Sequence, residues 1–167
     1  LSYLAFEQIL RAAPLKTQGE RMPGEWPVEL RHGGARKTSY VQPDGIFGFQ
    51  LLNAAKFYML EVDNGTMPVV RKTLQQTSLL RKLLAYSETY KSDIHKSRFS
   101  MGNMRVLFVV PSADRREKLK QTFRERVPGI SPQIFLAVDR AGLAEARGNV
   151  LLARWQDMEG RERMLVE

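Results

Sequence analysis

A run of four large apolar or aromatic residues, Phe57 to Leu60, leads directly into Glu61, Val62 and Asp63. Such a run is typical of a strand that is buried on both faces, and it predicts a central strand over residues 56–62. Ionised carboxylates are almost never fully buried without a partner. The fold must therefore bring cations, protons or a metal ion to the acids at the end of this strand.

A third acid, Asp44, lies in the segment Pro43-Asp44-Gly45, on what we expect to be a neighbouring strand. Asp63 lies two residues beyond Glu61 and therefore points to the same face of the strand. Carboxylates from adjacent strands, completed by water and substrate oxygens, are the ligands that Mg²⁺ prefers. We expect a divalent metal site, Mg²⁺ or Mn²⁺, whose ligands and catalytic residues are Asp44, Glu61 and Asp63. Glu7 and Glu20 are further candidate acids.

A purely structural interpretation of the same acids stays open. Asp44-Gly45 after a proline is also a common turn pair. The segment from Asp63 to Thr66 likewise suits a strand exit followed by a helix cap. Glu61 is harder to explain in this way, because it directly follows four large apolar side chains and its burial needs a partner.

The remaining pattern predicts an α/β fold with a mixed central sheet. The expected order is a helix over residues 2–13, three antiparallel strands, a crossover helix over residues 68–90, a parallel strand over residues 105–110, and a further helix and strand. Strands are expected at residues 26–31 and 37–42, followed after Pro43 to Gly45 by an extended segment at residues 46–52. A turn is expected at Asn53 to Ala55, before the strand at residues 56–62. A loop is expected over residues 91–102, and a last strand over residues 150–155.

Length and composition favour one domain with a real core. The chain has 167 residues, of which 43% are apolar, and it contains no cysteine. We expect residues 1–155 to form the domain and residues 156–167 to be a charged tail that frays. The absence of cysteine fits a cytoplasmic protein, and no apolar run is long enough to suggest a membrane partner. The two histidines, His32 and His95, are expected on the surface.

The net charge of +8 is unevenly distributed along the chain. Residues 71–126 hold 14 Lys and Arg against 5 Asp and Glu, whereas the remainder holds 12 against 13. A concentrated basic region is the electrostatic footprint expected for a polyanionic partner, although solvated helix faces would give the same count. The candidate nucleic-acid contacts are Arg71, Lys72, Arg81, Lys82, Lys91, Lys96 and Arg98.

Three segments, taken in order, carry a family resemblance: Gln42 to Phe47, Phe57 to Thr66, and Arg105 to Ser112. Together they resemble the PD-(D/E)XK nuclease superfamily, whose core is restriction-endonuclease-like. More narrowly, they resemble the replication-relaxation proteins of bacterial plasmids and mobile elements. The resemblance covers about residues 1–155, and Ala153 to Asp157 also resembles the end of that family.

The resemblance implies Asp44 and Glu61 as ligands of Mg²⁺ or Mn²⁺, DNA as partner or substrate, and an N-terminal winged-helix module that this chain lacks. It also implies an endodeoxyribonuclease activity in plasmid replication or mobilisation, with other replication or mobilisation proteins as further partners. A homodimer is left open.

One position departs from the superfamily pattern, because Asp63 stands where the signature lysine is expected. In active members that lysine orients the water or offsets charge on the phosphoryl group. A cation from the following helix could replace it, and Arg71, Lys72 and Lys82 are the candidates. Alternatively, Asp63 adds a third metal-binding carboxylate. The other hypothesis is a catalytically degenerate DNA-binding or protein-assembly module of the same fold.

Overall fold

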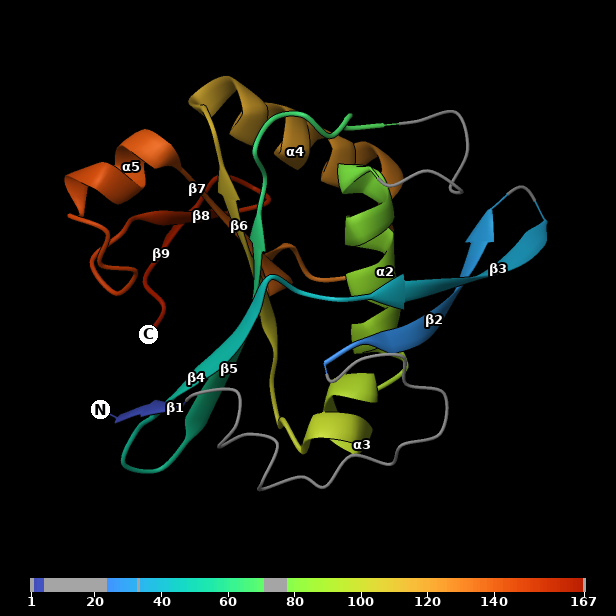
Figure 1. Ribbon diagram of the computed structural model, residues 1–167, viewed down its shortest axis with the longest axis horizontal. Helices are drawn as coiled ribbons and strands as arrows, with labels where there is room; N and C mark the ends of the chain where they lie inside the picture. Colours follow the sequence, from blue (N-terminus) through green and yellow to red (C-terminus); the bar gives the residue numbers. More distant parts are fainter. Residues whose placement is uncertain (1, 5–23, 33, 71–77, 167) are drawn as a thin grey trace.

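A computed structural model describes residues 2–4, 24–32, 34–70 and 78–166 (Figure 1). Seven of its strands form one sheet in the order β1-β4-β5-β6-β7-β8-β9. They are β1 (Ser2–Leu4), β4 (Gly45–Gln50), β5 (Ala55–Val62), β6 (Arg105–Val110), β7 (Phe135–Asp139), β8 (Trp155–Asp157) and β9 (Glu162–Arg163). The three central strands β5, β6 and β7 are parallel, and the flanking pairs are antiparallel. The prediction of an α/β fold with a mixed sheet is therefore confirmed.

Two further strands, β2 (Trp26–His32) and β3 (Ala35–Val41), form a separate antiparallel ribbon. They were expected to continue into the main sheet as part of one meander. Instead, the ribbon lies across helix α2 (Leu79–Lys91) and extends beyond it (Figure 1). Its apolar face explains this position, because Trp26, Val28, Leu30 and Val41 are buried in the same core as α2.

The other helices are α3 (Ile94–Phe99), α4 (Ala113–Arg126) and α5 (Arg140–Glu145), with a 3₁₀ turn at Pro132–Ile134. Figure 1 shows α2 and the ribbon on one side of the sheet and α5 on the other. Helix α4 begins as expected, because Ser112 accepts a hydrogen bond from the Arg115 amide. In the same way, Asp139 caps α5 by accepting from the Gly142 amide at 2.7 Å.

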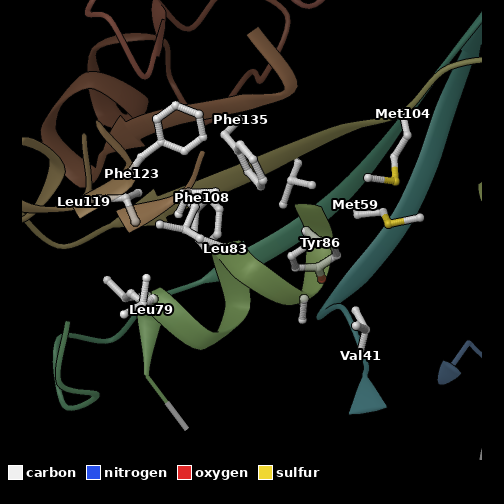
Figure 2. Close-up of a cluster of buried hydrophobic side chains, with 14 of the residues drawn as sticks. Val41, Met59, Leu79, Leu83, Tyr86, Met104, Phe108, Leu119, Phe123 and Phe135 are labelled. Atoms are coloured by element: carbon white, nitrogen blue, oxygen red, sulfur yellow. The ribbon is translucent and has the colours of Figure 1, made fainter. Parts of the chain in front are cut away.

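Two apolar cores cover the two faces of the sheet, and the strands supply them alternately. Val106, Phe108 and Val110 face α2 and α4, whereas Leu107 and Val109 face the other core. Figure 2 shows the first core, in which side chains of α2 meet those of β6, β7 and α4. Met59 on β5 belongs to this core, so Glu61, two residues further on, points to the same side.

Several predicted element boundaries were wrong. Residues 2–4 form an edge strand beside β4 rather than the start of a helix, and the rest of that expected helix lies outside the described residues. Short apolar segments do not distinguish the two conformations, and the exposed edge of β4 takes a partner. The crossover helix begins only at Leu79, because Ser78 caps it and Pro68 lies in a preceding non-helical segment.

Two predictions for the second half also need correction. The expected basic loop contains helix α3, and its His95 is buried rather than on the surface. The segment expected to fray instead adds β9 to the sheet and buries Met158 and Leu165 completely. Within the described residues, no helix is long and apolar enough to cross a membrane.

Candidate acidic site at the end of strand β5

The end of β5 places Glu61 and Asp63 on the face of the sheet that packs against the helices. Glu61 is 2% exposed and Asp63 is 6% exposed. Buried carboxylates need hydrogen bonds or opposite charges, because burial removes their hydration. The two acids satisfy this need with different partners from different helices.

Glu61 binds two side chains of α2. The Lys82 ammonium forms an ion pair with Oε2, and the Tyr86 hydroxyl donates to Oε1 at 2.5 Å. Lys82 and Tyr86 are four residues apart and therefore lie one helical turn apart on the same side of α2. Of the three cations proposed to replace the signature lysine, Lys82 thus contacts Glu61, while Arg71 and Lys72 lie outside the described residues.

Burial has the largest effect on the protonation of Glu61. It raises the pKa of Glu61 above its usual value, although Lys82 and the Tyr86 hydrogen bond act in the opposite direction. The pKa of Tyr86 is raised well above its usual value, first by burial and then by the charge of Glu61. Tyr86 therefore remains a hydrogen-bond donor, and Glu61 takes up a proton at a higher pH than an exposed glutamate does.

Asp44 precedes β4 and contacts the exit of β5. Its Oδ2 accepts from the Val62 amide at 2.7 Å, and its own amide donates to the Leu60 carbonyl at 2.9 Å. The Asp44 side chain is exposed, and its charge raises the pKa of both Glu61 and Tyr86. The structure therefore brings Asp44 and Glu61 to one corner of the sheet.

Asp63 is directed to helix α4. Arg115 donates from Nε to Oδ2 at 2.6 Å and from Nη2 to Oδ1 at 3.3 Å. The same guanidinium also donates to the Met67 carbonyl, and Oδ1 of Asp63 accepts from the Gly65 amide at 2.9 Å. The Gly65 contact fits the turn interpretation of this acid, whereas the helix cap expected at Thr66 is wrong, because residues 66–70 are not helical. Asp63 also binds the start of the following loop to α4.

The site combines two carboxylates and one ammonium group. The described residues contain no group of three or more His, Cys, Asp or Glu side chains that could hold a metal ion. Asp44 and Glu61 nevertheless fit Mg²⁺ or Mn²⁺, because such ions often bind one or two carboxylates and take water or substrate oxygens for the rest. Glu61 and Lys82 line a cavity of about 270 Å³ that also borders Arg81 and Ser39.

Most of the cations predicted to bind nucleic acid have partners within the protein. Arg81 donates to the Ser39 hydroxyl, and Arg98 donates to the Glu25 carbonyl. Lys96 pairs with Asp93, and Lys91 donates to the Pro128 carbonyl. Among the predicted cations that the structure describes, Lys91 and Lys96 are the exposed ones.

Sequence reasoning missed two residues of this site. Tyr86 has the helical spacing of a core residue and is indeed buried, but its hydroxyl also binds Glu61. Its position one turn after Lys82 was the available signal. Arg115 was not singled out, because its contact with Asp63 depends on how α4 packs at the end of β5.

Comparison of the chain with protein-family models, curated proteins and solved structures found no match. The interpretation of the site therefore depends on its own geometry. That geometry consists of the Asp44–Glu61 corner with Lys82, and of the separate Asp63–Arg115 pair.

Proposed function

We propose that this chain is a nuclease-like domain that binds DNA during plasmid replication or mobilisation. Asp44 and Glu61 would hold Mg²⁺ or Mn²⁺, and Lys82 would offset charge on the phosphoryl group. The observation that carries this proposal is the ion pair between Lys82 and the buried Glu61, next to Asp44. Lys82 of helix α2 would thus supply the cation that the superfamily pattern places on the strand, at the position of Asp63.

The proposed roles follow from the contacts of each residue. A bound divalent ion would polarise the phosphoryl oxygen and lower the pKa of its water. Tyr86 donates a hydrogen bond to the Glu61 carboxylate, and Lys82 lowers the pKa of Glu61 against the larger, opposite effect of burial. Asp63 and Arg115 fix the chain where it leaves β5. Because burial raises the pKa of Glu61, activity should fall on the acidic side as Glu61 takes up a proton.

The test is nicking of supercoiled plasmid DNA with Mg²⁺ or Mn²⁺, with EDTA as the metal-free control. We expect Asp44→Asn and Glu61→Gln each to lower the rate by about 100-fold or more, as loss of a group that stabilises transition-state charge does. The matched control is Asp114→Asn, since Asp114 lies on exposed α4 surface and pairs with Lys118. Cleavage that persists in both site variants would refute the assignment.

A second candidate function is DNA binding or protein assembly without catalysis. It is favoured by the internal partners of the acids, because each oxygen of Glu61 accepts one bond and Asp63 is engaged by Arg115. This function predicts salt-sensitive DNA binding without cleavage, unchanged in Asp44→Asn. Failure to bind DNA at low salt would leave assembly with other replication or mobilisation proteins as the remaining proposal.

A further inference from the structure

The tip of the β2–β3 ribbon carries cations on both of its strands. Arg31 and Arg36 are paired directly across the two strands, and both are exposed. Like charges placed directly opposite each other destabilise a strand pair. No ion pair joins either arginine to a carboxylate in the part of the chain that the structure describes. The nearby Glu29 accepts instead from the Thr38 hydroxyl at 2.5 Å.

The base of the ribbon is firmly held by the domain. The Trp26 indole donates to Thr89 of α2 at 2.8 Å, and its ring packs edge-on against Phe99 at 5.2 Å between centroids. Val28 and Leu30 continue the buried face. The ribbon is therefore anchored through its base, and it extends beyond α2 (Figure 1).

The basic surface continues from the tip onto the two helices. Arg31 and Arg36 line a cavity of about 550 Å³ together with Lys91 at the end of α2 and Arg126 at the end of α4. Two carboxylates, Glu29 and Glu88, also border it. Cations from four elements therefore face one hollow, as expected for a surface that follows a phosphate backbone.

We propose that the β2–β3 ribbon enters the major groove of duplex DNA, with Arg31 and Arg36 on base edges or phosphates and with Lys91 and Arg126 on the adjacent backbone. A two-stranded ribbon fits the major groove of B-form DNA, which is about 12 Å wide. The major groove of A-form RNA is too narrow and deep for side chains to read. The inference rests on the proposed function, because it requires DNA binding, but it does not require cleavage.

The test measures binding of wild-type protein to a DNA duplex and to an RNA duplex of the same sequence, over a series of salt concentrations. The main variant is Arg36→Glu, which changes the charge by two units and places opposite charges across the ribbon. The matched control is Arg147→Glu, because Arg147 is exposed beyond α5, on the other side of the sheet. Thermal unfolding checks that each variant is folded, and Arg31→Gln with Arg36→Gln is the second, neutral variant.

We expect Arg36→Glu to weaken DNA binding on the order of tenfold or more at 0.1 M salt, and to reduce the slope of log K against log salt by about one to two. The control should stay within about twofold. Normal binding by both ribbon variants would overturn this inference and leave the proposed function in place. RNA bound as tightly as DNA would overturn the groove assignment. No DNA binding by the wild type would overturn both proposals.

Discussion

Cations have different environments at the acidic site and at the ribbon tip. At the acidic site, Lys82 and Arg115 contact the buried carboxylates Glu61 and Asp63. At the tip, Arg31 and Arg36 face each other across two exposed strands. Residues 71–126 hold all of the excess positive charge of the sequence, yet several of their cations have partners inside the protein. The charge count of a segment therefore does not locate the surface that is open to a polyanion.

Burial explains the difference between the two regions. A buried carboxylate is costly unless an opposite charge or several hydrogen bonds accompany it, so the cations near Glu61 and Asp63 stabilise the fold. An exposed arginine keeps its hydration and is screened by salt, so its repulsion from a neighbour has a small effect. Substitutions at the acidic site should therefore lower the unfolding free energy, whereas substitutions at the ribbon tip should mainly change DNA binding.

Arg115→Met should have the largest effect on stability. The change leaves Asp63 buried without its guanidinium partner, and removing one member of a buried pair costs about 3–5 kcal/mol of unfolding free energy. Urea unfolding measures the loss. The matched control is Lys118→Met, which breaks an exposed pair with Asp114 and should cost at most about 1 kcal/mol. A loss below 1 kcal/mol in Arg115→Met would contradict the structural role of this pair.

Lys82→Met should destabilise the protein by about 2–3 kcal/mol at pH 7.5, less than Arg115→Met because Lys82 is partly exposed and solvent screens its charge. The effect should depend on pH. Because the pKa of Glu61 is higher in the folded state than in the unfolded state, the folded protein binds this proton first as the pH falls. Above the folded-state pKa, Glu61 is ionised, and burial of its charge destabilises the fold by the full amount. That cost disappears as the pH falls towards the usual value of 4.5.

The unfolding free energy of Lys82→Met should therefore approach that of the wild type as the pH falls from 7.5 towards the usual glutamate value of 4.5. Lys91→Met is the matched control, because Lys91 is exposed and its ammonium donates to a backbone carbonyl, that of Pro128, rather than to a buried carboxylate. A pH-independent difference between Lys82→Met and the wild type would show that Lys82 stabilises the fold through packing of its methylene groups.

Tyr86→Phe should cost about 1.5 kcal/mol, since it removes one hydrogen bond to a charged group and preserves the shape of the core. The loss of this donor should also raise the pKa of Glu61 further, because the Tyr86 hydrogen bond lowers it in the wild type. Unfolding free energies across the pH range measure both effects. Tyr90→Phe, one turn further along α2, is the control and should leave the pH dependence unchanged.

These contacts also show which parts of the structure the sequence could predict. The strands at residues 56–62 and 105–110 and the helix after Ser112 follow from local patterns of apolar residues and caps. Lys82 could be named as a partner of Glu61 because a crossover helix returns over the strand that precedes it. The Arg115–Asp63 pair could not be named, because it depends on the packing of two elements 52 residues apart in sequence.

The position of the ribbon could not be predicted either. Alternating apolar residues and the glycines after His32 predict that β2 and β3 pair with each other. They do not predict whether the pair joins the main sheet or crosses α2, because both positions bury Val28 and Leu30. The sequence therefore does not show that Arg31 and Arg36 lie beside Lys91 and Arg126, whereas the basic excess of residues 71–126 is evident from a charge count.

The smallest expected effect on stability comes from Arg36→Glu, and its sign is opposite to the others. The change replaces a like-charge pair with an opposite-charge pair at the Arg31 position, which should raise the unfolding free energy by about 0.2–1 kcal/mol. Thermal unfolding at low salt measures the gain, and high salt should reduce it. A protein that becomes more stable while its DNA binding weakens would show that the tip arginines serve a partner. If Arg36→Glu instead destabilises the protein, Arg36 has a structural role like that of Lys82 and Arg115, and the contrast between the two regions fails.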